Sequence, residues 1–170
     1  MQRTHFDQMR CPIAQSLERI GEWWSILIVR DAFRGLTKFD EFRQSLGVSP
    51  TMLARRLDTL VSNGILCKQP YQTRPVRHEY LLTARGEELF PVLLSLLSWG
   101  NAFLDGDPTV VPVHRRTGRP VAPQLIDKHT GRPLNFHNVR VTGGAGTAPG
   151  EKPASGPVSP YTDVSKQEKK

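Results

Sequence analysis

Apolar residues in the N-terminal part of the chain recur at the spacing of amphipathic helices. Ile13, Leu17 and Ile20 lie three or four positions apart, which predicts a first helix that ends near Gly21. Residues 22–34 are apolar on nearly all sides. We therefore expect this second helix to lie at the centre of a hydrophobic core.

The next two helices are predicted to meet across a turn of about three residues, the spacing of a helix-turn-helix. Thr37 is expected to cap a helix that carries Phe42 on its apolar side and ends at Gly47. Ser49 is expected to cap the following helix, residues 49–63, because serine is a favoured residue at that position.

The helix predicted over residues 49–63 has one apolar side, on which Leu53, Leu57 and Leu60 fall at core spacing. The side chains expected to face away from the core, and so to enter a DNA groove, are Thr51, Met52, Arg55, Arg56 and Thr59.

Two short runs, residues 65–71 and 78–83, contain β-branched and aromatic residues in alternation and predict a β-hairpin. The segment between them, residues 72–77, holds Arg74 and Arg77, so we interpret the hairpin as a basic wing.

A long helix is then predicted over residues 84–104, with Thr83 as its cap. Apolar residues cover most of its circumference, which is more than one domain can bury. We expect a second subunit to cover the remaining face, so the sequence predicts a homodimer.

From Asp105 onward Pro and Gly dominate and large apolar residues become sparse. The predicted fold class is mainly α with a small β-hairpin wing (α+β), a winged helix-turn-helix, plus a degenerate ribbon-like C-terminal extension. The expected organisation is an N-terminal arm at 1–10, the winged helix-turn-helix at 11–104, a linker at 105–112, the extension at 113–141 and a disordered tail at 142–170.

The extension contains a repeat, because Val113–Val121 and Ile126–Leu134 share Thr-Gly-Arg-Pro and lie thirteen residues apart. Two similar hairpins are expected, in the manner of the paired knuckles of a zinc ribbon. The ligand positions would be held by His114 with Thr117 and by Asp127 with Thr130. Threonine is a poor zinc ligand, so we expect no bound metal, and no cofactor is predicted.

The formal net charge of +7 favours an anionic partner. Residues 49–78 hold five arginines and lysines and one acidic residue, so they form a local basic face. We expect double-stranded DNA as the partner. The sequence shows neither a membrane-spanning stretch nor a signal peptide, so we expect a cytoplasmic protein that makes no membrane contact.

The residue order also resembles the HxlR-type regulators, winged-helix repressors and activators, over about residues 10–104. The pieces that carry this resemblance are Cys11-Pro12-Ile13, Ile20-Gly21, Trp24 to Arg30, Phe39 with Phe42, Ser49-Pro50, Met52-Leu53, Arg56-Leu57, Asn63-Gly64-Ile65, Glu79-Tyr80, Leu82-Thr83 and Gly86. The resemblance implies a homodimer assembled through the first and last helices on a two-fold related operator. The residues assigned to that interface are Ile13, Leu17, Leu93, Leu96, Leu97, Trp99 and Phe103.

Several contacts with DNA are predicted. Arg55 or Arg56 is expected to pair with guanine O6 and N7, and Ser49 with the free amides at its helix start is expected to meet a phosphate. Arg74, Arg77 and Lys38 are expected to contact the backbone, Arg74 and Arg77 alternatively the minor groove. The alternative is that these cations form only a solvated face.

Cys11 is the candidate sensor, because several members of the resembling family sense electrophiles or oxidants through a matching cysteine. The alternative is a small buried hydrophobe. Trp23 and Trp24 are interpreted as core residues rather than as a pocket for a small-molecule effector. His78 is expected either to touch phosphate or to end a strand.

The predicted function is a DNA-binding transcriptional regulator, expected to be a repressor rather than an enzyme. The alternatives are a winged-helix protein-interaction module without DNA binding and a thiol enzyme built on Cys11. No His and carboxylate motif is placed to activate that thiol.

Overall fold

The computed structural model describes residues 6, 9, 11–104 and 110–141. Most of the predicted arm 1–10, most of the linker 105–112 and the whole tail 142–170 lie outside the described residues. The chain divides into two compact units, residues 1–123 and 124–170, and each is described by itself.

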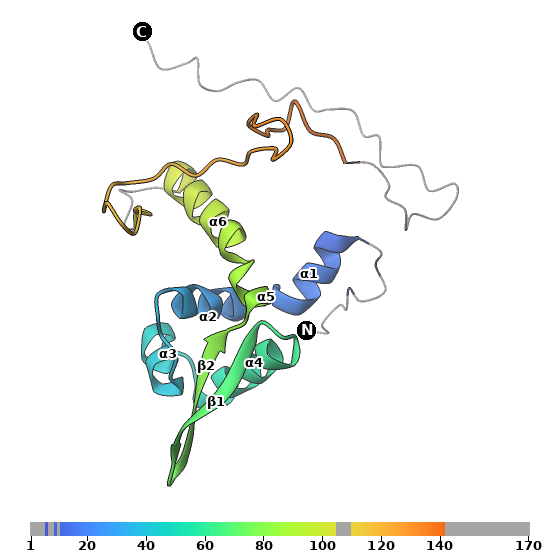
Figure 1. Ribbon diagram of the computed structural model, residues 1–170. Coiled ribbons are helices and arrows are strands. Elements are labelled where there is room, and N and C mark those ends of the chain that lie inside the picture. Colours follow the sequence, from blue (N-terminus) through green and yellow to red (C-terminus); the bar gives the residue numbers. More distant parts are fainter. Residues whose placement is uncertain (1–5, 7–8, 10, 105–109, 142–170) are drawn as a thin grey trace. The chain divides into compact units, whose positions relative to one another are not determined.

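Within the described residues of the first unit, six helices and one β-hairpin lie between Pro12 and Phe103 (Figure 1). The helices are α1 (Pro12–Ile20), α2 (Trp23–Phe33), α3 (Phe39–Leu46), α4 (Pro50–Ser62), α5 (Ala84–Glu87) and α6 (Phe90–Phe103). The strands are β1 (Leu66–Thr73) and β2 (Val76–Leu82).

The helix-turn-helix prediction is confirmed: α3 and α4 are separated by three residues. Gly47 takes the left-handed backbone conformation, with φ of 64°, that lets the chain leave α3 and turn into α4. Ser49 then caps α4, because its Oγ accepts a hydrogen bond from the Met52 amide at 3.3 Å.

The prediction that Thr37 caps α3 is wrong. The N-cap residue is Lys38, and the orphan amides of Thr37 and Lys38 both donate to Glu41 Oε2 at 2.9 Å. The Glu41 carboxylate thus reaches back from the first turn to the N-cap amide, which is one half of a capping box. The backbones of Lys38 and Glu79 form an isolated antiparallel β-bridge, and the Tyr80 amide donates to the Thr37 carbonyl at 2.7 Å. This segment therefore lies along β2.

The two strands pair antiparallel from Leu66 with Leu82 to Thr73 with Val76. Arg74 and Pro75 alone connect them, so the predicted basic loop over 72–77 is shorter than expected and its other residues belong to the strands. A bulge at Tyr71 shifts the register between Pro70 and Gln72. In Figure 1 the hairpin projects beyond the helices, as a wing does.

The single long helix predicted over 84–104 is wrong, because α5 ends at Glu87 and α6 begins at Phe90. Pro91 explains the interruption: proline donates no hydrogen bond and its ring collides with the carbonyl four residues earlier, which is that of Glu87. The Thr83 cap is confirmed, since its Oγ accepts from the Gly86 amide at 3.0 Å.

The hydrophobic core lies among the end of α1, the helices α2, α3 and α4, and the base of the hairpin. Its buried members are Ile20, Ile28, Val29, Phe42, Leu53, Leu57, Leu60, Ile65, Leu66 and Tyr80.

The interpretation of Trp23 as a core residue is wrong, because its side chain is 79% exposed. At 100° per residue, Trp23 falls on the side of α2 opposite Ile28 and Val29, which are buried. Trp24 is half-buried.

The described residues after the gap at 105–109 form turns closed by single bridges rather than continuous strands. Val113 bridges Pro120, and Ile126 bridges Pro133. Each Thr-Gly-Arg-Pro repeat therefore makes one short knuckle, a hairpin of the kind that the repeat predicted. The first knuckle belongs to the first compact unit and the second to the other.

Candidate nucleic-acid interface

The outer side of α4 presents the side chains that were predicted to enter a groove, with one exception. Thr51, Met52 and Arg55 are exposed, Met52 by 39% of its surface. Thr59 is half-buried, and its hydroxyl donates to the Arg55 carbonyl at 2.9 Å. Of the two cations of α4, Arg55 is therefore the one that is exposed.

The exception is Arg56, which was expected to face the groove beside Arg55. Its side chain is only 12% exposed, and its Nη2 lies 2.9 Å from Glu22 Oε2. Arg56 flanks the apolar stripe of Leu53 and Leu60, so packing turns its guanidinium toward the start of α2. Its prediction as a base-reading residue is corrected: within this chain it is a structural residue.

The start of α4 fits an anion in one further respect. Pro50 has no amide hydrogen, Met52 donates to Ser49 and Leu53 donates to the Ser49 carbonyl. The Thr51 amide has no partner among the described residues. One donor therefore remains at the positive end of the helix, next to the exposed Ser49.

The wing carries its cations at the tip and along one side. Arg74 lies in the connection and Arg77 in β2, and both are exposed. The Gln72 side-chain amide donates to the Arg74 carbonyl at 3.0 Å, which fixes the connection. Among the described residues, neither arginine forms an ion pair, so both guanidinium groups are available to an external anion.

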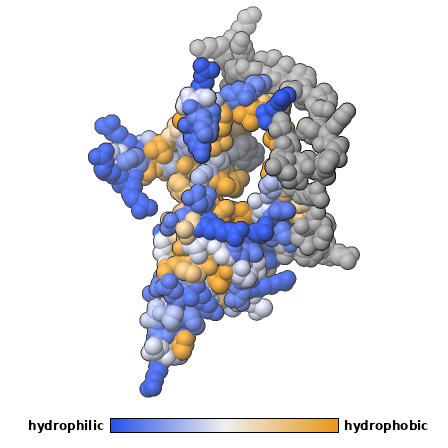
Figure 2. Space-filling model, turned by 45° about the vertical axis from the view of Figure 1, so that its right-hand side comes forward, coloured by the Kyte–Doolittle hydropathy of each residue, from blue (hydrophilic) through white to orange (hydrophobic). Residues whose placement is uncertain are grey.

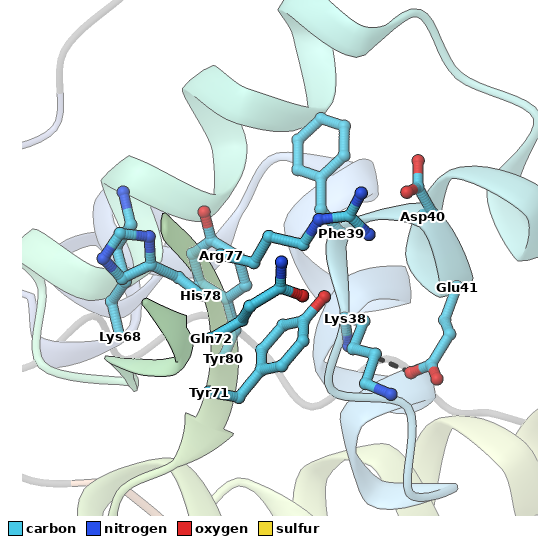
Figure 3. Close-up of a pocket in the computed structure, with 10 residues that line it drawn as sticks. All are labelled: Lys38, Phe39, Asp40, Glu41, Lys68, Tyr71, Gln72, Arg77, His78 and Tyr80. Atoms are coloured by element: carbon cyan, nitrogen blue, oxygen red, sulfur yellow. Dashed lines mark hydrogen bonds between the residues drawn. The ribbon is translucent and has the colours of Figure 1, made fainter. Parts of the chain in front are cut away.

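A groove of about 660 Å³ separates the wing from the start of α3 (Figure 3). Lys38 Nζ lies 5.2 Å from the centre of the Tyr71 ring, and Lys68 Nζ lies 5.8 Å from that of Tyr80. The groove is lined by Lys38, Phe39, Asp40, Glu41, Lys68, Tyr71, Gln72, Arg77, His78 and Tyr80.

The charged groups that line this groove differ in whether they are already bonded within the chain. The amides of Lys38 and Thr37 donate to Glu41 and lower the pKa of its carboxyl, so that acid is used within the chain. Lys38, Lys68 and Arg77 extend from the exposed walls. A lysine that already lies above an aromatic ring is partly ordered, so it loses less side-chain freedom when it binds a phosphate.

Sequence reasoning did not assign Lys68, Tyr71 or Gln72 to the interface, and it left His78 undecided. The sequence signal that could have found these residues is the alternation of side chains along each strand, because directly opposite residues of a hairpin lie on the same face. The structure pairs Lys68 with Tyr80 and Pro70 with His78. The bulge at Tyr71 breaks the alternation, so the pattern alone does not show which side chains meet α3.

The residues predicted for a dimer interface lie mostly on the surface of the chain. Ile13 is 71% exposed, Trp99 58% and Phe103 73%, while Leu17 and Leu96 are exposed by about half. Leu97 is half-buried, and Leu93 packs against the core instead. No residue of α6 is buried. Figure 2 shows hydrophobic surface gathered away from the hairpin end, which is mostly hydrophilic.

The two cysteines occupy different surroundings. Cys11 is exposed and is the N-cap residue of α1, without a side-chain capping bond. Cys67 is half-buried in β1, where the Gln69 side-chain amide donates to its sulfur at 3.8 Å. Among the described residues, no group of three or more His, Cys, Asp or Glu side chains could hold a metal ion. No described helix is long and apolar enough to cross a membrane.

Comparison with known proteins gives a consistent result. The family model described as HxlR-like helix-turn-helix matches residues 19–108. An HTH-type transcriptional regulator of Mycobacterium tuberculosis is 36% identical over 137 residues, 79% of this chain and 86% of the relative. An aligned span of that length cannot fit within residues 1–104, so the similarity continues into the extension.

Several solved structures resemble this fold, among them the following two. The crystal structure of PA1607, described as a transcription factor, is 40% identical with a TM-score of 0.74, and the match covers 82% of this chain and 99% of that one. The redox regulator HypR in its oxidised form is 31% identical with a TM-score of 0.52, covering 56% of this chain and all of that chain.

Proposed function

This chain belongs to the HxlR-like helix-turn-helix family of transcriptional regulators, and from that premise we propose a homodimeric repressor that binds a pseudo-palindromic operator. Its DNA-binding winged helix-turn-helix presents α4 and the wing as separate contacts. The proposal assigns base recognition to α4 and backbone contact to the wing. Because duplex DNA is the proposed ligand, we also propose that the protein is cytoplasmic.

The observation that carries the proposal is the contrast between Arg55 and Arg56. Arg55 is exposed on the outer side of α4, whereas Arg56 is paired with Glu22. An exposed arginine on a helix in the major groove can donate two hydrogen bonds to guanine O6 and N7. We therefore assign base reading to Arg55 together with Thr51, Met52 and Thr59, and leave Arg56 out.

Backbone contacts are proposed for both sides of the groove at the wing. Lys38 at the start of α3 and Arg77 on β2 line its opposite walls, and Arg74 extends from the tip. Ser49 and the Thr51 amide are proposed to hold a further phosphate at the start of α4. These contacts position the protein without reading sequence.

A second copy of the chain is proposed to cover the exposed apolar side chains of α1 and α6. Within the described residues these side chains stay uncovered, since Ile13 and Phe103 are each more than 70% exposed. A two-fold dimer would set two α4 helices about one DNA turn apart, roughly 34 Å, which is the reason for a pseudo-palindromic operator. A dimer bound to an operator that overlaps a promoter blocks transcription, so we propose repression.

An oxidant, an electrophile or another small effector is proposed to act on Cys11. This thiol is exposed at the start of α1, the helix that carries Ile13 and Leu17. Its modification would lie beside the proposed dimer contact, where a change of geometry alters the spacing of the two α4 helices. The likeness to the redox regulator HypR supports an oxidant as the effector.

The test of DNA recognition begins with selection of bound sequences from a random duplex pool. We expect a two-fold related consensus, and we expect Arg55→Ala to weaken binding to it by about 1–3 kcal/mol with relaxed base preference. Arg55→Lys, which keeps the charge but not the paired hydrogen bonds, should lose the preference as well. A pool that shows no enrichment would identify a winged-helix protein-interaction module instead.

The sensor is tested separately. Operator affinity of the wild type and of Cys11→Ser is measured before and after mild oxidation. We expect loss of affinity in the wild type alone. Equal loss in both proteins removes Cys11 from the proposal and leaves DNA recognition unaffected.

A further inference from the structure

The two knuckles of the extension have the same backbone. The His114 amide donates to the Arg119 carbonyl at 2.8 Å, and the Asp127 amide donates to the Arg132 carbonyl at 2.9 Å. Gly118 and Gly131 have φ of 66° and 67°, in the left-handed region that lets each turn reverse. The repeat in sequence is therefore a repeat in structure.

Side-chain acceptors hold each turn from within. In the second knuckle, Asp127 Oδ1 accepts from the His129 amide at 3.0 Å, and Asp127 Oδ2 accepts from Thr130 Oγ1 at 2.7 Å. In the first, His114 Nδ1 accepts from the Arg116 amide at 3.3 Å. These bonds restrict the turn, so the remaining side chains extend from a defined backbone.

Those remaining side chains are basic and exposed. The tips, residues 114–119 and 127–132, contain no apolar residue, and their one acid is Asp127, both of whose oxygens serve the turn. Within the part of the chain that the structure describes, none of the tip cations forms an ion pair. The exposed tip cations are Arg115, Arg116, Arg119, Lys128 and Arg132.

We propose that the tips of the two knuckles bind DNA backbone phosphates outside the contacts of α4 and the wing, independently of sequence. A guanidinium group matches phosphate with two parallel hydrogen bonds, and a restricted turn lowers the entropy lost when they form. The proposal rests on the proposed function, because it extends DNA binding to a part of the chain with no helix-turn-helix.

An acidic protein surface is the competing occupant of these tips. Protein interfaces obtain most of their affinity from buried aromatic, aliphatic or arginine anchors at a desolvated centre. The knuckle tips offer arginines without any apolar neighbour in the same turn, since the apolar Val113, Val121, Ile126 and Leu134 stand at their stems. Charge without an apolar centre favours the phosphate backbone, whose binding needs none.

The test uses the full chain and a mixed-sequence duplex, whose affinity is measured between about 50 and 200 mM salt. In one variant all five tip cations are replaced by glutamine. In the control the four arginines become lysine and Lys128 stays, which keeps the charge. Each phosphate contact contributes about 0.9 to the slope of log affinity against log salt, so the glutamine variant should lose about 2–4 of that slope.

Three results are informative. A smaller slope in the glutamine variant, with the lysine variant like the wild type, supports the inference. An unchanged slope in the glutamine variant overturns it and leaves the tips to an acidic protein partner. Arg74→Ala distinguishes failure of the knuckle inference from failure of the proposed DNA binding. If Arg74→Ala lowers the salt slope while the glutamine variant does not, the knuckle inference alone is wrong.

Discussion

The guanidinium of Arg56 and the carboxylate of Glu22 form an ion pair, with 2.9 Å between Nη2 and Oε2, that joins the middle of α4 to the start of α2. Glu22 is the N-cap residue of α2, and Arg56 lies two turns into the proposed recognition helix. The pair therefore fixes the recognition helix on the core rather than serving the groove.

Arg56→Ala is expected to lower the free energy of unfolding by about 1–3 kcal/mol, because a mostly buried ion pair between α4 and the start of α2 is lost. Urea denaturation of Arg56→Ala, Glu22→Gln and the double variant gives the coupling energy between the two side chains. At a temperature where it is folded, Arg56→Ala should keep the base preference of the wild type. A changed preference with unchanged stability would contradict this assignment.

The helix-turn-helix could be predicted because its determinants are local. Gly47, Ser49 and the leucines of α4 specify a turn, a cap and a buried stripe within a few residues of one another. The role of Arg56 depends on a residue of α2, so it follows from tertiary packing. A sharper use of the helical period would have placed Arg55 opposite the leucine stripe and Arg56 at its edge.

The same contrast holds elsewhere in the chain. The break before α6 was present in the sequence as Pro91, whose effect on a preceding turn is local. The groove at the wing could not be predicted in this way, because it depends on the bulge at Tyr71 and on the backbone β-bridge between Lys38 and Glu79. Composition likewise showed that α6 is apolar, while its exposure could be seen only once the neighbouring elements were placed.

Arg74→Ala is expected to weaken DNA binding about equally for all sequences. Because the exposed Arg74 is proposed to meet a phosphate, its loss should reduce the salt slope by about 1. Fluorescence anisotropy on operator and mixed-sequence duplexes measures both quantities. Arg85→Ala on α5, which also removes an exposed arginine, is the control and should leave the slope unchanged. If both variants behave alike, net charge rather than the wing explains the effect.

Leu96→Glu and Trp99→Glu are expected to give monomers. Both side chains are more than half exposed in the subunit, so the substitutions should change its intrinsic stability by less than about 1 kcal/mol while placing charges in the proposed contact. Sedimentation analysis measures the oligomeric state. Val76→Glu, at an exposed apolar position of the wing, is the matched control and should leave the dimer intact. A wild-type protein that sediments as a monomer would rule out the proposed interface.

We expect the Glu41 carboxylate to cause a specific loss of stability in acid. Its folded pKa lies below its ordinary value because the Lys38 and Thr37 amides donate to it. A depressed carboxyl pKa stabilises the fold fully above the unfolded pKa, and that contribution is lost as the pH falls through the folded pKa. The stability difference between wild type and Glu41→Ala should thus be constant near neutral pH and shrink below about pH 4.3. Urea titrations at stepped pH measure it, and a difference independent of pH would contradict the role of charge.

Gly86 is expected to tolerate no side chain. It is buried where α5 meets the base of the hairpin, and a Cβ there would collide with the Ile65 carbonyl oxygen and lie 3.0 Å from Leu82 Cδ2. The Ile65 carbonyl is held in place, since it accepts a hydrogen bond from the Thr83 amide at 3.1 Å. Gly86→Ala should therefore destabilise the fold by about 1–3 kcal/mol, although alanine is the better helix former by about 1 kcal/mol.

Chemical denaturation of Gly86→Ala checks this expectation, with Arg85→Ala as the control at the neighbouring exposed position of α5. The control should stay within about 0.5 kcal/mol of the wild type, as surface substitutions do. Because Gly86 contacts Ile65 rather than the exposed side chains of α4, a folded Gly86→Ala protein should also bind DNA with unchanged base preference. Stability equal to the wild type would mean that α5 moves freely against Ile65, and the hairpin base would then not be held by this contact.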